Sequence, residues 1–584
     1  MANISGGELI ARMLAAEGVD TVFGIIDGTY LGLNFSFKPL GIRLITPRHE
    51  SSAAHMAGAY ARSTGRLGVC IASNGPGVAN VLPGVAVENG EGNRVLLITS
   101  CRRHGIIYPD RGGAYQYFNQ VAVTRPMTKW SGAVPEFARI PELLRRALRL
   151  CFTGRPGVVH LDVPEDIVNG KFSFDPDTLL PPERYRRTQP LPAPDTLVEE
   201  AAKRLVQADC PMIHAGSGVI HAGAAETLAE VATFLQAPVT TSWGGRGAVP
   251  EDHECAVPMV HLDVNREVRN AADLVLALGT RFGETDWWGK PPYWREPAGQ
   301  QMIQVDIDEE TLGLNKPVDL PVVADAGRFL EQLLEALRRH GEPAGPERRR
   351  QRLAGWRRAV AEDRRKLDRR LEEDTSAVHP ARVPTVCQEV FGDDAMWVLD
   401  GGNTVIWGMF YHQARRPGHI DSTFKFGMLG AGVGQALGIR AAWPEREVCC
   451  IIGDGAMGFH PQEIETAVRN GLKVVFVVMA DKQWGMVKMT QQFARRPIKT
   501  LVRKQLGPDE TVNADLGEIA WDRLAESMGA WGTRVSRNAD LRAALEQARA
   551  QPGCAVVHVD VDPVAHMWAP NLKSFKEMHA EPGA

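Results

Sequence analysis

The sequence lacks three features that would place it in a special class of protein. It has no excess of positive charge, since 66 Lys and Arg residues stand against 70 Asp and Glu residues, for a formal net charge of −4. General nucleic-acid binding needs a basic surface, so this class is excluded. No apolar run approaches the length of a transmembrane helix, and the start MANISGGELIARML has neither the basic residues nor the cleavage site of a signal peptide. We therefore expect a cytoplasmic protein that binds neither nucleic acid nor membrane.

Paired cysteines are also absent. The nine cysteines are scattered along the chain, and no C-x-x-C pair occurs among them. Most lie inside apolar runs, as Cys70, Cys210 and Cys449 do. This pattern favours buried, reduced thiols over disulfides or a zinc site.

The length of the chain predicts several domains. At 584 residues it is too long for one core, and about three domains of somewhat under 200 residues are expected. Residues 1–185, 190–345 and 381–584 each alternate strand and helix patterns, and residues 346–380 are dominated by charged residues at helical spacing. Because strands separated by helical crossovers form parallel sheets, we predict an α/β protein of three Rossmann-like parallel-sheet domains, with 346–380 as a charged linker.

The most informative stretch is CCIIGDGAMGFHPQEIETAVRNGLKVVFVVMADKQWG, residues 449–485. Short apolar runs punctuated by glycine predict buried strands at Cys449–Ile452 and Val474–Met479. Between them we predict a turn at Gly453-Asp454-Gly455 and a helix through Asn470, with Pro461 in its first turn.

Asp454 and Asp481 follow these two strands directly. Because parallel sheets bind ligands at the carboxyl ends of their strands, we expect both carboxylates at one binding edge. The glycine turn and the helix N-terminus beside them favour a phosphate, whose charge a divalent cation would offset. These residues predict a diphosphate bridged to the protein by magnesium, although a Gly-Asp-Gly sequence by itself can be only a strand-end turn.

The spacing in this stretch resembles the thiamin diphosphate (ThDP) binding motif, in which Gly-Asp-Gly is followed at this distance by Asn-Asn. Here 24 residues, 456 to 479, separate Gly455 from Ala480-Asp481. Asp481 stands where the family has its second Asn, a metal ligand. Gln483 falls where the family offers a backbone carbonyl to the metal.

Further motifs occur in the family's order: Arg48-His49-Glu50, Ser73–Gly77 and Gly427–Leu429. Over its whole length the chain resembles ThDP-dependent enzymes of the acetohydroxyacid synthase type, a group that includes benzaldehyde lyase and 2-hydroxyacyl-CoA lyases. The resemblance implies a pyrimidine-binding domain at 1–185, a central domain at 190–345 and a diphosphate-binding domain at 381–584.

Glu50 is the first catalytic residue that the resemblance implies. In the family this carboxyl is hydrogen-bonded to N1′ of the aminopyrimidine and favours the tautomer whose 4′-imino group generates the C2 carbanion. A carboxylate at a strand-to-helix junction can otherwise be a simple helix N-terminal charge.

Other positions match family residues around the cofactor. Leu429 takes the place of the bulky residue that bends the cofactor, and Gly427 would offer its carbonyl to N4′. Thr29 and Gln116 match catalytic pocket positions beside the thiazolium. The remaining matches are cofactor contacts at Asn74, Gly402, Asn403, Thr404, Gly453, Gly455, Ala456, Gln483 and Trp484, and metal ligands at Asp454, Asp481 and Gln483.

The resemblance also implies an assembly. In the family the catalytic glutamate comes from one subunit and the diphosphate site from another, so we expect at least a homodimer, or a homotetramer of two such dimers.

The reaction is less closely defined than the mechanism. In the family an ylide adds to a carbonyl, the adduct loses CO2 or an aldehyde-like fragment, and the enamine that remains is protonated or attacks a second carbonyl. Residues 108–113 lack the paired histidines of pyruvate-decarboxylase-like enzymes, Thr490 replaces the tryptophan of acetohydroxyacid synthases, and Thr29 replaces the histidine of benzaldehyde lyase. Trp484-Gly485 and Gln491-Gln492 are more similar to the lyases.

Our first hypothesis is therefore a C–C lyase or carboligase acting on 2-keto or 2-hydroxy acyl substrates, CoA esters among them. The alternative is an acetolactate synthase, in which the central domain would also hold FAD. A third hypothesis is a catalytically weak, cofactor-binding regulatory homologue, because Asp481 adds negative charge beside a diphosphate.

Two segments outside these motifs carry further expectations. Residues 486–505 include Arg495, Arg496 and Lys499 without clear periodicity, which favours a partly mobile, solvated basic loop beside the site or a holder for an anionic substrate. In the central segment, residues 214–218 lack the third glycine of a dinucleotide fingerprint and predict only a tight turn. Arg281, at a strand end, either lines a pocket or is structural.

Overall fold

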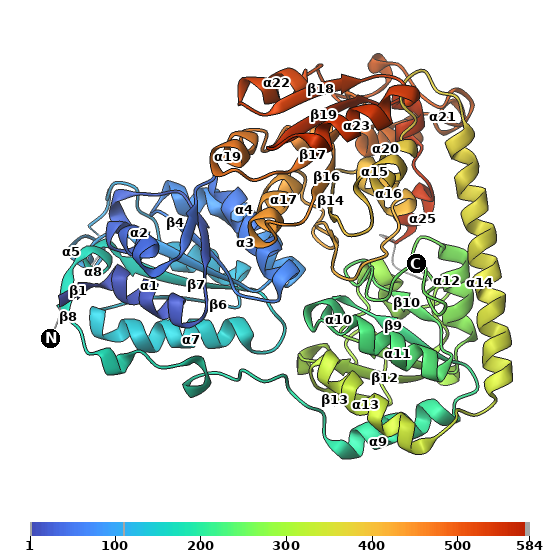
Figure 1. Ribbon diagram of the computed structural model, residues 1–584, viewed down its shortest axis with the longest axis horizontal. Helices are drawn as coiled ribbons and strands as arrows, with labels where there is room; N and C mark the ends of the chain where they lie inside the picture. Colours follow the sequence, from blue (N-terminus) through green and yellow to red (C-terminus); the bar gives the residue numbers. More distant parts are fainter. Residues whose placement is uncertain (1–2, 109–110, 579–584) are drawn as a thin grey trace.

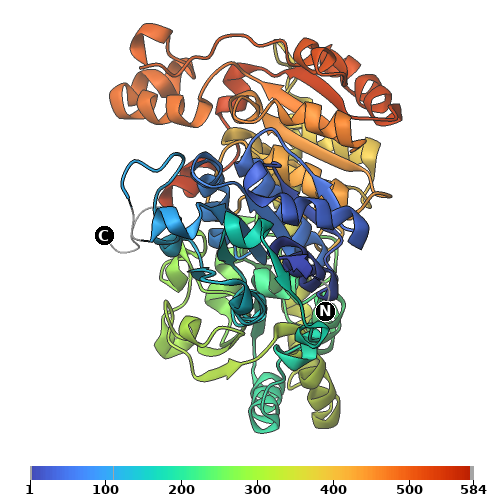
Figure 2. The ribbon, with the colours of Figure 1, turned by 90° about the vertical axis from the view of Figure 1, so that its left-hand side faces the viewer.

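The computed structural model describes residues 3–108 and 111–578, and the statements below concern these residues. Residues 109 and 110 of the stretch 108–113 lie outside them. Three α/β domains are each built around a parallel sheet, which confirms the predicted fold class (Figures 1 and 2).

The N-terminal domain contains a six-stranded parallel sheet in the order β3-β2-β4-β5-β7-β6. Its strands are β2 (Thr21–Gly24), β3 (Arg43–Ile45), β4 (Gly68–Ala72), β5 (Val95–Cys101), β6 (Trp130–Ala133) and β7 (Val158–Pro164). The helices are α1 (Gly6–Ala16), α2 (Leu31–Phe37), α3 (Glu50–Thr64), α4 (Pro76–Glu91), α5 (His104–Ile107), α6 (Gln120–Thr124), α7 (Ile140–Phe152) and α8 (Glu165–Asn169). A small antiparallel pair, β1 (Asn3–Ser5) and β8 (Lys171–Ser173), closes one end.

The central domain holds a five-stranded parallel sheet in the order β10-β9-β11-β12-β13. Its strands are β9 (Pro211–Ala215), β10 (Val239–Thr241), β11 (Leu274–Leu278), β12 (Gln301–Asp306) and β13 (Leu320–Val323). Its helices are α9 (Asp195–Gln207), α10 (Ser217–His221), α11 (Ala225–Leu235), α12 (Leu262–Ala271) and α13 (Ala326–His340). The segment 214–218 is a strand end that leads into α10, and Arg281 follows β11.

Helix α14 (Pro346–Asp368) connects the central and C-terminal domains and runs along one side of the molecule (Figure 1). Although its sequence is highly charged, it is attached at both ends. Arg349 is buried and donates to the carbonyl oxygens of Leu235 and Leu205 at 2.9 and 3.0 Å, which satisfies the C-terminal ends of α11 and α9. Near the other end, Arg364 donates to the carbonyl oxygen of Phe410 at 2.6 Å.

The C-terminal domain contains a six-stranded parallel sheet in the order β15-β14-β16-β17-β19-β18. Its strands are β14 (Met396–Asp400), β15 (Ile420–Asp421), β16 (Val448–Gly453), β17 (Val475–Ala480), β18 (Trp531–Val535) and β19 (Ala555–Asp560). Its helices are α15 (Arg382–Phe391), α16 (Asn403–Tyr411), α17 (Ala431–Ala442), α18 (Asp454–Met457), α19 (Glu463–Asn470), α20 (Gly485–Arg495), α21 (Pro497–Arg503), α22 (Trp521–Ser527), α23 (Leu541–Ala550), α24 (Pro563–Met567) and α25 (Leu572–Glu577).

One helix from each outer domain forms the joint between these two domains. Helix α3 packs against α17, and one hydrophobic cluster includes residues of both domains. The approach is close because α17 has glycines at the contact. A Cβ at Gly438 would lie 2.2 Å from the carbonyl oxygen of Met56, and one at Gly434 would lie 2.9 Å from the Cβ of His55.

The structure corrects the expectation for residues 486–505. These residues form helices α20 and α21 instead of a mobile loop. The buried positions of α20 are Gly485, Lys488, Met489 and Gln492, which follow the helical period. Because two of them are polar, no hydrophobic pattern marked the helix.

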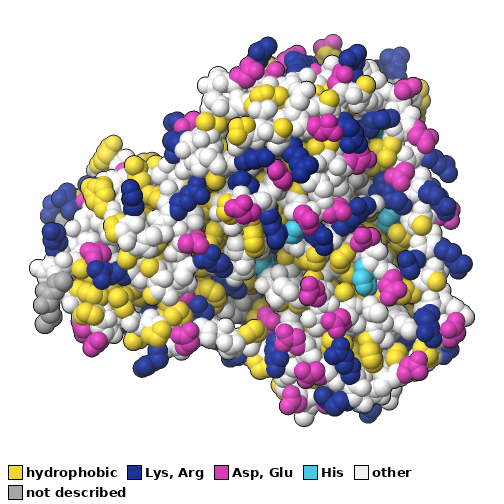
Figure 3. Space-filling view, viewed as in Figure 1, with side chains coloured by type: hydrophobic (Ala, Val, Ile, Leu, Met, Phe, Trp, Pro, Cys, Tyr) yellow, Lys and Arg dark blue, Asp and Glu magenta, His cyan; other side chains and the backbone are white. Residues whose placement is uncertain are grey.

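All nine cysteines are buried and unpaired, as the sequence predicts. None of the helices in the described part of the chain is long and apolar enough to cross a membrane. Figure 3 shows charged side chains of both signs interspersed over one face of the molecule.

Candidate active site

Two carboxylates lie at one edge of the C-terminal sheet. Strands β16 and β17 are parallel neighbours, so Asp454 and Asp481, which follow them, emerge at the same edge. Their exposed fractions are 8% and 7%. Asp454 accepts hydrogen bonds from the backbone N–H groups of Gly455 and Lys482, at 2.8 and 2.9 Å. These backbone donors fix the direction of the carboxyl.

Asp454 lies buried beside a second carboxyl group at this edge. Burial, and then the charge of Asp481, raise the pKa of Asp454. A divalent cation between the two carboxyl groups would remove this repulsion. No group of three or more His, Cys, Asp or Glu side chains that could hold a metal occurs among the described residues. Magnesium is commonly bound by one or two carboxylates together with phosphate oxygens, so the pair fits this ion when a phosphate-bearing ligand is present.

Asn403 provides polar atoms for such a ligand. It begins helix α16 at the end of the neighbouring strand β14 and is 4% exposed. Neither atom of its amide group has a hydrogen-bond partner within the described residues. A Cβ at Gly485 would lie 2.7 Å from Asn403 Nδ2 and 3.2 Å from Asp481 Oδ2, so these three residues surround one point. Buried polar groups without partners are unusual, so the amide of Asn403 fits a contact with a polar ligand at this point.

The glycine turn after β16 is covered by an aromatic ring. A Cβ at Gly455 would lie 2.8 Å from the ring of Trp484, and one at Gly453 would lie 3.0 Å from Thr404 Oγ1. Gly402 lies just before α16, where a Cβ would be 3.5 Å from Met486. The three strand ends of β14, β16 and β17 therefore form a tight cradle around the two carboxylates.

The remaining predicted site residues of the C-terminal domain lie beside this cradle. Gln483 is buried, and its side chain donates to Asp481 Oδ2 at 3.1 Å. Gly427 has φ +67°, in the left-handed region that favours glycine, and Leu429 is half-buried. The carbonyl oxygen of Ala456 lies 3.2 Å from where a Cβ of Gly430 would be.

Glu50 is in the N-terminal domain. It is the first residue of α3 and is 8% exposed. Its Oε2 accepts a hydrogen bond from Asn80 Nδ2 at 3.1 Å, and a Cβ at Gly77 would lie 3.5 Å from Oε1. One carboxyl oxygen therefore has a protein donor and the other faces Gly77 in the first turn of α4.

Three further predicted residues of this domain are joined by Ser100. The hydroxyl of Ser100 lies 2.6 Å from Thr29 Oγ1 and accepts from the backbone N–H of Asn74 at 3.0 Å. Asn74 Nδ2 donates to the carbonyl oxygen of Gln116 at 2.8 Å. Gln116 has φ +54°, a strained conformation for a residue with a side chain, and the bond from Asn74 holds it there.

The predicted residues thus form two sets, one on each outer domain. Among the described residues, no hydrogen bond joins Glu50, Thr29, Asn74 or Gln116 to the cradle of the C-terminal domain.

Sequence reasoning missed two residues of these sets. Ser100 is the second-last residue of β5, and its place near a strand end is the signal that could have indicated it. His566, which contacts Asp481, lies on α24 more than eighty residues away, and no spacing signal pointed to it.

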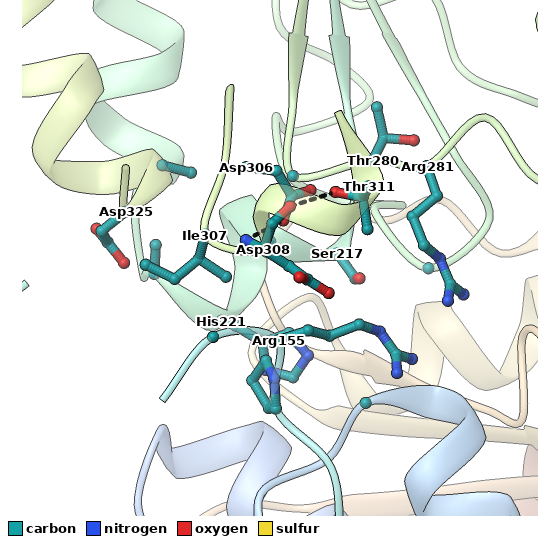
Figure 4. Close-up of a pocket in the computed structure, with 18 of the residues that line it drawn as sticks. Arg155, Ser217, His221, Thr280, Arg281, Asp306, Ile307, Asp308, Thr311 and Asp325 are labelled. Atoms are coloured by element: carbon teal, nitrogen blue, oxygen red, sulfur yellow. Dashed lines mark hydrogen bonds between the residues drawn. The ribbon is translucent and has the colours of Figure 1, made fainter. Parts of the chain in front are cut away.

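A cavity of about 1090 Å³ lies apart from both sets, between the N-terminal and central domains. Arg155 reaches into it from the N-terminal domain and Arg281 from the central domain, and Asp308 also lines it (Figure 4). Asp306, at the end of β12, accepts from the backbone N–H of Asp308 at 3.0 Å. Burial raises the pKa of Asp306 to about 6. Of the two interpretations of Arg281, the structure favours the pocket-lining one.

The chain matches three domain families. The thiamine pyrophosphate enzyme N-terminal TPP binding domain matches residues 4–123, the central domain matches residues 198–333, and the C-terminal TPP binding domain matches residues 400–559.

Several curated proteins are similar over nearly the whole chain. An acetolactate synthase of Mycobacterium bovis is 31% identical over 95% of this chain and 87% of its own length. The acetolactate synthase large subunit of Haemophilus influenzae and the isozyme 3 large subunit of Escherichia coli are each 28% identical, over 98% of this chain and 97% of their own lengths.

Proposed function

The chain belongs to the thiamine pyrophosphate enzymes of the acetohydroxyacid synthase type, and we propose that it decarboxylates a 2-keto acid and joins the acyl unit to a second carbonyl compound, as an acetolactate synthase does. The observation that carries this proposal is the similarity to acetolactate synthases over 95% of the chain. It favours our alternative hypothesis over the broader lyase reading. Similarity to enzymes in all three domains also disfavours a catalytically weak, cofactor-binding regulatory homologue.

The proposed roles of the residues follow from their contacts. ThDP, when bound, supplies a carbanion that adds to the carbonyl of the substrate. Glu50, shielded from water, holds a proton at N1′ of the aminopyrimidine. Asn403, Thr404 and the turn Gly453–Gly455 bind the diphosphate. Their backbone N–H groups are aligned at helix N-termini, which favour negative charge.

Magnesium completes the proposed site. Asp454 and Asp481 supply carboxylate oxygens and Gln483 its carbonyl oxygen, while the diphosphate supplies further oxygens. The fit rests on the mutual repulsion of the two carboxylates and on the partnerless amide of Asn403.

The reaction is tested by incubating the purified protein with ThDP, Mg²⁺ and pyruvate. We expect acetolactate, detected as acetoin after acid decarboxylation, and no product when ThDP is omitted. Cleavage of an acyloin or a 2-hydroxyacyl-CoA without acetolactate formation would overturn the synthase proposal and support the lyase.

One observation favours the lyase as a second candidate. Thr490, in the position of the synthase tryptophan, is exposed, and its hydroxyl donates to the carbonyl oxygen of Met486 at 2.9 Å. A small side chain there leaves room for a larger acyl group than acetyl. Parallel assays with longer 2-keto acids measure this preference directly.

We also propose FAD as the ligand of the large cavity. Its volume of about 1090 Å³, the two arginines and the strand-end carboxylate Asp306 suit a diphosphate and a ribose. Because the proposed reaction has no net redox step, a flavin there would be structural. Arg155→Glu should lower the flavin absorbance of the purified protein, whereas Arg358→Glu, an exposed change on α14, should not. Equal flavin content in both variants would contradict the assignment.

For the assembly, we propose a cytoplasmic homodimer or homotetramer with active sites between subunits.

A further inference from the structure

Asp481 is paired with a buried histidine. Its Oδ2 lies 2.6 Å from His566 Nδ1, and the two side chains are 2% and 5% exposed. His566 belongs to α24, which follows β19, the strand beside β17. The Asp481–His566 pair therefore links the segments that follow two neighbouring strands, β17 and β19, next to the cradle.

The second nitrogen of the ring contacts another residue of the cradle. His566 Nε2 lies 3.1 Å from Thr404 Oγ1, and Trp407 Nε1 donates to the carbonyl oxygen of His566 at 2.9 Å. The turn before it is also fixed, because Asp562 Oδ1 accepts from the backbone N–H of Ala565 at 2.8 Å. The imidazole thus has one packed position from which it reaches both β17 and α16.

These contacts leave one oxygen of Asp481 available. Oδ2 accepts from His566 and, at 3.1 Å, from the side chain of Gln483. Oδ1 has only a long contact with the backbone N–H of Gln483, at 3.4 Å. Two donors on one oxygen suit a carboxylate, which accepts at both oxygens, better than an asparagine, whose amide would present a donor of its own.

We propose that His566 is a positioning residue that holds Asp481 Oδ2 and so directs Oδ1 to the divalent cation of the cofactor site. The proposal rests on the proposed ThDP and magnesium site. It explains how aspartate serves where the family motif has asparagine, because a ring N–H that donates to Oδ2 stabilises the carboxylate. Partners of metal ligands of this kind typically change metal affinity by roughly 10–100-fold when they are removed.

The test measures Mn²⁺ affinity in the presence of ThDP, by the electron paramagnetic resonance signal of free Mn²⁺, on the full chain. His566→Asn places an amide nitrogen near the position of Nδ1 and keeps the bond to Asp481. His566→Gln places its nitrogen near Nε2 and keeps only the bond to Thr404. We expect binding within about threefold of wild type for Asn and roughly 10–100-fold weaker binding for Gln.

A second comparison uses Asp481→Asn. In that background His566→Gln should change Mn²⁺ affinity by less than about threefold, since the two changes act on one interaction. His558→Phe, a matched change of a fully buried histidine on β19, should leave Mn²⁺ affinity unchanged.

The outcomes separate this inference from the proposed function. If wild-type protein binds no Mn²⁺ with ThDP, the cofactor site itself is wrong. If wild type binds and the Asn and Gln variants are equal to each other, whether both tight or both weak, the positioning role is overturned, because a nitrogen at the position of Nδ1 would then make no difference to Mn²⁺ affinity.

Discussion

Glu50 is a nearly buried carboxyl with one donor, Asn80, and one oxygen facing the first turn of α4. If it exchanges a proton with the cofactor, an amide of the same shape should bind ThDP and fail in turnover. We expect Glu50→Gln to lower kcat by about a hundredfold or more, the range of proton-transfer catalysis, with ThDP affinity nearly unchanged. Steady-state kinetics and ThDP titration measure the two quantities. Glu88→Gln, a buried glutamate of the same domain, is the control, and normal turnover by Glu50→Gln would reject the role.

Glu88 itself predicts a dependence of stability on pH. It is fully buried, Oε1 contacts His55 Nδ1 at 2.8 Å, and Oε2 accepts from Asn93 Nδ2 at 2.6 Å. Burial raises the pKa of Glu88 to about 8, although the charge of Arg62 opposes this, and burial lowers the pKa of His55 to about 3. The folded protein therefore keeps a proton that the unfolded chain releases, so this contribution to stability is lost as pH rises through about 8.

Glu88→Gln removes that loss and keeps both hydrogen bonds. We expect the Tm of the variant, relative to wild type, to rise by at least about 2 °C between pH 5 and pH 8, as roughly 1 kcal/mol would produce. Asp162, whose pKa burial raises to about 7, contributes equally to both proteins and cancels in the difference. Thermal scans at several pH values measure it, and a difference that shrinks with pH would contradict the assignment.

For single residues, the sequence predicted the candidate site residues that directly follow strands. It did not predict a residue, such as His566, that is proposed to act through another residue. Asp454 and Asp481 were found because each comes directly after an apolar run. His566 was not, because its contact with Asp481 depends on β19 lying beside β17, and a single sequence does not give strand order.

At the scale of elements, the contact between α3 and α17 depends on small residues. Gly438→Ala places a methyl group against the carbonyl oxygen of Met56, and overpacking of this kind costs about 1–3 kcal/mol. Gly355→Ala, in α14, meets nothing within 4 Å and should stabilise its helix by about 0.5–1 kcal/mol. We expect Gly438→Ala to lower the midpoint of urea unfolding and Gly355→Ala to raise it. A higher midpoint for Gly438→Ala would show that α3 and α17 are not tightly packed at the joint.

Helices α20 and α21 show where element prediction fails. Lys488 occupies a buried position of α20 because its amine pairs with Asp515 at 2.6 Å, and Gln492 is fully buried beside Met567. Contacts with residues distant in the sequence allow these polar side chains to be buried, and the local sequence does not indicate such contacts. Apolar strands flanked by glycine, in contrast, were predicted to within a residue or two.

At the scale of the whole molecule, the two sets of site residues predict complementation between subunits. Glu50→Gln and Asp454→Asn chains should each be inactive alone. If each active site takes Glu50 from one subunit and Asp454 from its partner, a mixed dimer contains one intact site, and random mixing should restore about a quarter of wild-type activity. Co-expression with two different tags, followed by assay, measures this. No activity above that of the single variants would place both residues of a site in one chain.

The outer domains share one strand order. Numbered within each domain, both sheets read 2-1-3-4-6-5, and the helices before the third strand of each, α3 and α17, are the pair that pack together. Asn74 and Asp454 follow the third strands, while Ser100 and Asp481 lie at the ends of the fourth. This correspondence is what duplication of a single ancestral unit that paired with itself would leave. At these corresponding positions the C-terminal domain has acidic residues and the N-terminal domain has neutral ones, so under the proposed function a nearly symmetric pair of domains would hold the two chemically different ends of one molecule.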